Sequence, residues 1–184
     1  MDLPALTFDY NLVPLSIVDN GHTIMISYAP GSMLKVGDKV YELTQFHFHH
    51  PSEENISGTE FDMVAHLVHK DAEGHLAVVA VLFTKGPANP LVEILWQNIP
   101  AEKQKAITLD SVSVNVKDLL PAEFGYYTFS GSLTTPPCTE GVTWYVLKTS
   151  SNLSPQQLAK FAKIYPANNR PIQPIYEREI PESR

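Results

Sequence analysis

The sequence predicts a mainly β fold with a few short helices at its periphery, and three observations support this. Short apolar runs rich in β-branched and aromatic residues recur along the 184 residues. The 15 prolines and 9 glycines are scattered between these runs, as expected for many strands joined by turns. No internal repeat, low-complexity segment or linker divides the chain, so we expect one domain over residues 1–184.

The elements follow from local patterns. The expected strands, in chain order, are residues 22–28, 39–50, 60–70, 75–84 and 142–148. The sequence DAEG (71–74) has the chemistry of a hairpin turn between two of them. The apolar spacing in NPLVEILWQN predicts a helix over 89–98. A second helix over 154–165 is favoured by Ser154 as N-cap and Pro155 at the first helical position.

Composition excludes several classes of protein. Hydrophobic residues make up 43% and charged residues 18%, which is ordinary for a soluble globular protein. The net charge of −7, with no dense run among the 13 basic residues, argues against binding nucleic acid or anionic lipid. No apolar stretch approaches the ~20 residues that span a bilayer. The opening MDLPALTFDY lacks the features of a secretory signal, which as given predicts a cytoplasmic location.

Three histidines suggest a metal site. In QFHFHH (45–50), strand alternation places His47 and His49 on one face and His50 on the other. His66 lies on the next expected strand, so antiparallel pairing would let three imidazoles converge. Three imidazoles with a fourth position left for water are typical of catalytic rather than structural zinc. The alternative, that these are ordinary core or surface histidines, stays open on this pattern alone.

Five segments, taken together and in order, resemble α-class carbonic anhydrases of the bacterial type. They are NGHTI (20–24), QFHFHHPSEE (45–54), DMVAHLVH (62–69), GSLTTPPCTEGVTWYVLK (131–148) and NNRPIQP (168–174). The resemblance runs from about residue 3 to about residue 177. It implies a single domain built on a large, mostly antiparallel, twisted central sheet. It also implies a zinc enzyme, inhibited by sulfonamides, that reversibly hydrates carbon dioxide to bicarbonate and a proton.

The resemblance assigns a role to each residue of the reaction centre. It implies Zn²⁺ bound by His47, His49 and His66. Thr134 would accept a hydrogen bond from the zinc-bound hydroxide and donate its own proton to Glu53. A hydroxyl group whose proton is committed in this way can only accept from the hydroxide, which keeps a lone pair aimed at the substrate carbon.

The resemblance also implies how substrate and proton move. His22 matches the residue that relays the proton to solvent, a task suited to a group titrating near ~6.5. Thr135 would help to position bicarbonate. An apolar wall for carbon dioxide would consist of Val68, Val78, Leu133, Val142 and Trp144.

Outer partners of the zinc ligands differ from the family pattern at one ligand. Gln45 and the backbone carbonyl of Asn168 would orient the first two imidazoles. Relatives usually have a glutamate two residues before the ligand that matches His66, but this chain has Val64 there. Relatives also commonly have a histidine directly after the residue that matches Glu53, but this chain has Glu54 there. We hypothesise that Glu54 accepts the free N–H of His66 instead. The alternative is that water or backbone fills the gap and Glu54 is solvated.

Two further departures affect turnover and stability. Met25 stands where relatives usually carry a polar side chain, so we expect a less ordered proton path and a lower ceiling on turnover. Relatives also carry an N-terminal segment whose cysteine bonds the equivalent of Cys138, which is therefore expected to be unpaired. Without that segment, core surface and a sheet edge would be bared. Three alternatives stay open. The chain is naturally short and cytoplasmic, or it is a trimmed form of a periplasmic or secreted protein. In the third, another protomer covers the bared surface, as in a homodimer.

Two functions from different classes remain. The first is an active zinc carbonic anhydrase acting on a small-molecule substrate. The second is a non-catalytic or impaired binding or structural module, because of the missing N-terminal segment. Retention of all three histidines together with Glu53 and Thr134 favours the enzyme.

Overall fold

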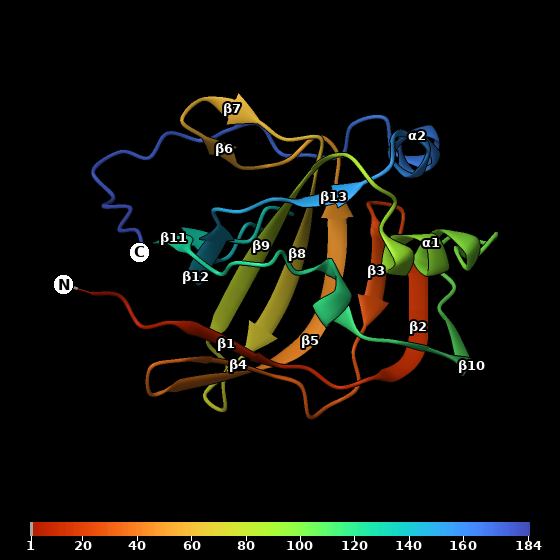
Figure 1. Cartoon of the computed structure of the whole chain (residues 1–184), viewed down its shortest axis with the longest axis horizontal. Helices are drawn as coiled ribbons and strands as arrows, with labels where there is room; N and C mark the ends of the chain where they lie inside the picture. Colours follow the sequence, from red (N-terminus) through yellow and green to blue (C-terminus); the bar gives the residue numbers. More distant parts are fainter. Residues whose placement is uncertain (1) are drawn as a thin grey trace.

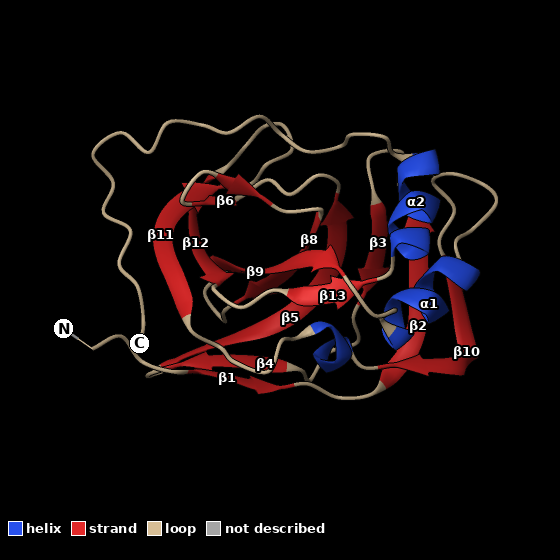
Figure 2. Cartoon of the chain, turned by 45° about the horizontal axis from the view of Figure 1, so that its top comes forward, coloured by secondary structure: helices blue, strands red, loops and turns tan. Residues whose placement is uncertain are grey.

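The computed structural model describes residues 2–184 and is dominated by one large sheet (Figures 1 and 2). Its main path has the strand order β10-β2-β3-β5-β8-β9-β12-β11, with β1, β4 and β13 attached beside it. Neighbouring strands are antiparallel except where β12 and β13 pair with β9. The predicted mainly β, mostly antiparallel fold is therefore confirmed.

The elements have the following bounds. The strands of the large sheet are β1 (Leu6–Asp9), β2 (Val13–Asp19), β3 (Ile24–Ser27), β4 (Met33–Val36), β5 (Lys39–His49), β8 (Met63–Lys70), β9 (Leu76–Lys85), β10 (Ile107–Val114), β11 (Tyr126–Ser132), β12 (Glu140–Leu147) and β13 (Ser151–Leu153). A separate hairpin consists of β6 (Asn55–Ile56) and β7 (Thr59–Glu60), and the helices are α1 (Pro90–Gln97), η1 (Val116–Leu119) and α2 (Pro155–Ile164).

All five predicted strands form, with ends that differ by a few residues, and both predicted helices form. The turn at 71–74 joins β8 to β9, with the Gly74 N–H donating to the Asp71 carbonyl at 3.1 Å. A capping box explains where α2 begins. The Ser154 hydroxyl accepts from the Gln157 N–H, and the Gln157 side-chain oxygen accepts from the Ser154 N–H.

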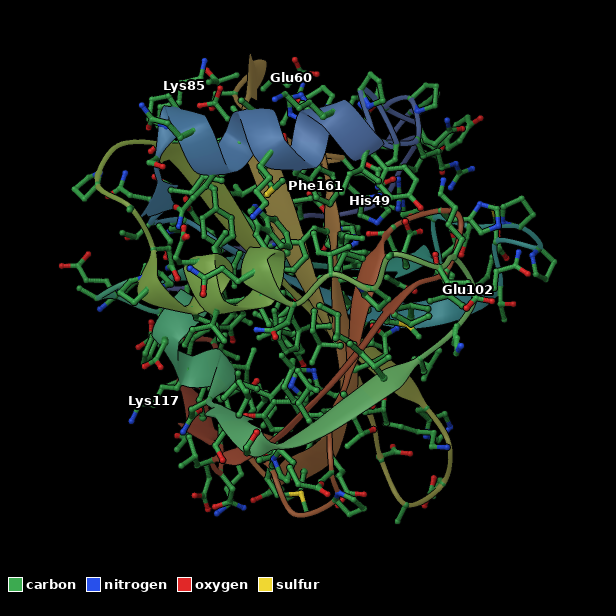
Figure 3. All side chains as sticks on the ribbon, turned by 90° about the vertical axis from the view of Figure 1, so that its right-hand side faces the viewer. His49, Glu60, Lys85, Glu102, Lys117 and Phe161 are labelled. Atoms are coloured by element: carbon green, nitrogen blue, oxygen red, sulfur yellow. The ribbon has the colours of Figure 1, made fainter. Side chains whose placement is uncertain are left out.

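The sheet buries a different set of side chains on each face. On one face, Phe48 packs against Trp96 of α1 and Phe161 of α2, with ring centroids 5.0 and 6.4 Å away. Figure 3 shows Phe161 on the inner side of α2. The opposite face carries a smaller apolar cluster, which we call the second cluster. Its buried members are Val64, Val68, Val78, Ala80, Leu82, Val142, Trp144 and Val146.

The chain after α2 runs without helix or strand past the end of the sheet at β11 (Figure 2). It is fixed there by the Thr128 N–H, which donates to the Pro181 carbonyl at 2.9 Å, and by the Ser183 N–H, which donates to the Tyr126 carbonyl at 2.8 Å. The two termini lie close together (Figure 1), and Arg184 Nε is 3.3 Å from Asp2 Oδ1. Among residues 2–184, no helix has the length and apolar character needed to cross a bilayer.

The buried His69 makes stability depend on pH. Burial lowers the pKa of His69 to about 4, while its Nε2 lies 2.7 Å from the Tyr10 hydroxyl on the helix-covered side. In the unfolded chain a histidine titrates near ~6.5. Between these two values the unfolded state binds the additional proton, so the free energy of unfolding falls as pH drops from about 6.5 to 4, by up to about 1.4 kcal/mol per pH unit.

We expect His69→Gln, which keeps an acceptor for Tyr10, to remove this contribution. The difference in the free energy of unfolding between pH 7 and pH 5, measured by urea titration, should shrink by about 2 kcal/mol. His22→Gln, at an exposed position whose ring makes no hydrogen bond or ion pair with other described residues, is the matched control. An unchanged pH dependence in His69→Gln would contradict this account.

Candidate metal centre

Three histidines converge on the face of the sheet opposite the helices. In the antiparallel pair β5–β8, His47 lies directly across from His66, and His49 is two residues further along β5. One ring nitrogen from each histidine lies within 4.8 Å of the others. The ring centroids are 5.1, 5.5 and 4.8 Å apart for the three pairs. The convergence predicted from strand parity is confirmed.

The outward nitrogen of each ring faces an oxygen acceptor. The three contacts are His47 Nδ1 to Gln45 Oε1 (2.8 Å), His49 Nδ1 to the Asn168 carbonyl (3.0 Å) and His66 Nε2 to Glu54 Oε1 (2.6 Å). Because these oxygens accept, the facing nitrogens carry the protons. The inward atoms, His47 Nε2, His49 Nε2 and His66 Nδ1, are left with lone pairs.

Burial favours the neutral form of two of the three histidines, His47 and His66. Desolvation lowers the pKa of His66 to about 3, and the neighbouring His49 adds to the effect. Desolvation, followed by the nearby His66 and His49, holds the pKa of His47 well below its usual value. The inward Nε2 of His49 is buried and has no hydrogen-bond partner within residues 2–184. An unpartnered buried acceptor is costly, and three converging imidazoles match the nitrogen ligands that zinc takes, so the residues fit a zinc ion.

Glu53 lies beside this cluster and is held by backbone. Its side chain is 4% exposed, and its Oε1 accepts from the Arg170 N–H at 2.6 Å. Its other oxygen, Oε2, lies 3.8 Å from His66 Nδ1 and has no hydrogen-bond partner. The expected hydrogen bond from Thr134 is therefore not formed in the structure. Arg170, rather than Thr134, fixes the carboxylate.

Glu54 occupies the position that the hypothesis requires. Its contact with His66 joins two largely buried side chains, 11% and 2% exposed. Burial raises the pKa of the Glu54 carboxyl to about 7, and the nearby His49 opposes the shift. Val64 is fully buried in the second cluster and offers no polar atom. Whether Glu54 tunes a bound metal stays a prediction.

The expected apolar wall lies next to the histidines. Val68, Val78, Val142 and Trp144 are buried members of the second cluster, and Leu133 packs against it. The Trp144 ring is 4.9 Å from the His66 ring, nearly perpendicular to it. The indole N–H of Trp144 donates to the Ser132 carbonyl at 3.1 Å, which fixes the ring. Thr134 is half-buried and Thr135 exposed, in the loop that follows β11.

The remaining predicted residues lie at the turn between β2 and β3. His22 is exposed there. Met25 of β3 pairs with His47 of β5 and so shares the face of the metal centre. No hydrogen bond or ion pair joins the His22 ring to other described residues.

A groove of about 810 Å³ lies beside the three-histidine cluster. It lies between β11–β12 and the C-terminal segment, and Glu53, Glu54 and Trp144 contribute to its wall. The C-terminal side carries exposed apolar residues, among them Ile175 and Tyr176, 54% and 81% exposed. Cys138 is free and half-buried.

Two contributions were not foreseen from the sequence. One is the backbone N–H of Arg170, described above. The other is the side chain of Asn168, whose Oδ1 accepts from His50 N at 2.8 Å and whose Nδ2 donates to the carbonyls of His22 and Phe48 at 3.0 Å each. The motif NNRPIQP pointed to this region. The hydrogen-bond partners of Asn168 and Arg170 lie more than a hundred residues away in sequence, so no local sequence pattern identifies them.

The sheet and its cluster define a β protein with a buried three-histidine centre that fits zinc. The family profile described as eukaryotic-type carbonic anhydrase matches residues 1–184. The chain therefore belongs to the α-carbonic anhydrase family, a family of enzymes, as the sequence motifs had indicated.

Individual relatives agree with this assignment. A carbonic anhydrase of Pectobacterium carotovorum is 45% identical over 165 residues, which are 89% of this chain and 67% of the relative. The structure of a hyperthermostable carbonic anhydrase from a hydrothermal vent chimney superimposes with a TM-score of 0.95 at 45% identity, covering all of this chain and 82% of that one. The enzyme of Thermovibrio ammonificans, solved with the inhibitor sulfanilamide, gives a TM-score of 0.93 at 39% identity, covering 98% of this chain and 80% of that one.

We expect the purified protein to bind one zinc ion per chain. His49→Ala removes the buried inward nitrogen, so zinc affinity should fall by more than the roughly 10–100-fold that the loss of an outer partner costs. Isothermal titration with a competing chelator measures this. His75→Ala, which alters an exposed histidine in the 71–75 turn, should bind zinc as the parent does. Equal affinity in His49→Ala would show that the metal binds elsewhere.

Proposed function

We propose that the protein catalyses the zinc-dependent, reversible hydration of carbon dioxide to bicarbonate and a proton. The observation that carries this proposal is the set of three imidazoles whose inward nitrogens converge between a buried carboxylate and an apolar wall. Membership of the α-carbonic anhydrase family supports it.

His47 Nε2, His49 Nε2 and His66 Nδ1 would hold the zinc ion, since these atoms face one another and carry lone pairs. Zinc in such a site lowers the pKa of a bound water from 15.7 to roughly 7 and so provides a nucleophile at neutral pH. The acceptors behind each ring fix its tautomer and orientation and make it a stronger ligand. Of the three acceptors named above, only the Glu54 carboxyl can carry a charge.

Thr134 and Glu53 would orient the nucleophile. The free Oε2 of Glu53 is a buried acceptor that needs a donor. We propose that the Thr134 hydroxyl turns to donate to it in the loaded enzyme, since catalytic hydrogen bonds often tighten only once the site is occupied. The threonine oxygen can then only accept from the nucleophile, which leaves the reacting lone pair pointing to the substrate.

The second cluster would receive the substrate. Carbon dioxide has no net dipole, so an apolar surface beside the nucleophile is enough to hold it. Val68, Val142 and Trp144 present such a surface next to His66. Thr135, exposed at the entrance loop, would contact the more polar bicarbonate.

His22 would carry the released proton to solvent. It is exposed, and a histidine titrating near ~6.5 can both take up and release a proton at neutral pH. Met25 lies on the neighbouring strand position and offers no hydrogen bond to water between the centre and His22. We therefore expect proton release to limit turnover when buffer is scarce.

The direct test is stopped-flow hydration of carbon dioxide. The zinc-loaded protein should accelerate hydration, and a chelator or an aromatic sulfonamide should abolish the acceleration. His22→Ala should lower kcat at low buffer concentration while leaving kcat/KM unchanged, and added imidazole should restore kcat. A zinc-loaded protein that does not accelerate hydration would contradict the proposal and favour a non-catalytic binding or structural module.

The role of Glu54 has its own test. Glu54→Gln removes the charge behind His66, so zinc affinity should fall about 10–100-fold. Chelator competition measures the change. Glu60→Gln, at an exposed position of β7, is the matched control. Equal zinc affinity in Glu54→Gln and the parent would show that this carboxylate does not support the ligand.

A further inference from the structure

The turn that carries His22 is ordered by its own residues. It comprises residues 20–23, between β2 and β3. Asn20 N donates to the Thr23 carbonyl at 3.1 Å, and Asn20 Oδ1 accepts from the N–H groups of His22 and Thr23 at 2.9 Å each. Gly21 has φ +86°, a conformation open to glycine. These local bonds set the shape of the turn but not its place over the sheet.

Two side chains tie the turn to the strand of the metal ligands. Thr23 Oγ1 donates to the Phe48 carbonyl and accepts from the Phe48 N–H, at 2.5 and 3.2 Å. Asn168 Nδ2 donates to the carbonyls of His22 and Phe48. Phe48 is the residue between His47 and His49, so the turn is anchored directly to the ligand strand.

A third anchor comes from the helix-covered face and has no part in the chemistry proposed above. Asp19, the last residue of β2, is 4% exposed, and its Oδ1 accepts from the Gly21 N–H at 3.0 Å and from the Tyr165 hydroxyl. Tyr165, the C-cap of α2, is 8% exposed, and burial followed by the Asp19 contact raises the pKa of its hydroxyl, which therefore stays protonated and donates. A buried carboxylate is retained only where hydrogen bonds compensate its desolvation. This one receives a bond from the turn and a bond from the helix.

We propose that the hydrogen bond between Asp19 and Tyr165 positions the His22 turn for proton transfer. Tyr165 is thus a positioning residue that acts through the turn, and this inference rests on the proposed role of His22. A relay through water depends on the reach of the imidazole, and a displacement of ~1 Å can cost a large factor in rate. The anchor lies on the face away from the metal centre, so its loss leaves the outer acceptors of the three ligands in place.

The test is Tyr165→Phe in the zinc-loaded protein of 184 residues. We expect kcat for hydration at low buffer concentration to fall severalfold, kcat/KM to stay within twofold of the parent, and imidazole to restore kcat. The amide hydrogen of Gly21 should exchange faster with solvent. NMR measures this exchange independently of activity. Tyr28→Phe is the matched control, because this buried hydroxyl bonds to Asn11 and Val116 and not to the turn.

Three comparisons separate this inference from a general loss of stability. Asp19→Asn keeps an acceptor for Tyr165 and should retain most of kcat, whereas Asp19→Ala should behave as Tyr165→Phe does. In a His22→Ala background, Tyr165→Phe should cause no further loss, because no relay is left to position. The same fold loss in both backgrounds, or full kcat in Tyr165→Phe where His22→Ala is impaired, would overturn the inference. If His22→Ala itself has no effect on kcat, the proposed relay fails and the positioning role with it, while the proposed hydration activity stands on its separate test.

Discussion

The register between β5 and β8 is the constraint on which the rest of the site depends. It places His47 opposite His66 and leaves His49 on the same face, because the pairing is regular from Gln45 to His49, after a shift in register between Leu43 and Gln45. A shift of one residue in this pairing would turn His66 into the helix-covered core and end the cluster. The register is stabilised on both faces, by Phe48 of β5 packing under α1 and α2 and by the second cluster on the other face.

Burial and hydrogen bonding then make these imidazoles into ligands. Desolvation disfavours the charged forms of His47 and His66, and an oxygen behind each of the three rings selects the nitrogen that keeps its lone pair. The three acceptors differ in kind: an amide, a backbone carbonyl and a carboxylate. At His66 the carboxylate comes from Glu54, on the loop after β5, while Val64 extends the apolar cluster. The carboxylate behind this ligand thus comes from a loop and not from the ligand's own strand.

The sequence was sufficient to predict those features of the fold and the site that depend on a local pattern. Strand alternation around His47 and His49, the cap at Ser154 and the turn at 71–74 were all foreseen, because each depends on neighbours along the chain. Strands such as β10, whose pairing with β2 shifts register between Leu109 and Ser113, were missed because their alternation is weak and interrupted. The contacts of Asn168 and Arg170, and the anchor between Asp19 and Tyr165, join distant segments and can be seen only in the folded chain. The bond expected between Thr134 and Glu53 is not formed: the Arg170 backbone holds one oxygen of that carboxylate, and the other has no partner among the described residues.

A crystal structure of the zinc-loaded protein with anomalous data at the zinc edge tests the central claim most directly. The account predicts one strong peak bonded to His47 Nε2, His49 Nε2 and His66 Nδ1 at distances of about 2.0–2.1 Å, with a single non-protein ligand completing a tetrahedron. It also predicts that each outward nitrogen keeps the oxygen partner described above. A peak at another location, or coordination through the opposite nitrogen of any of the three rings, would contradict it.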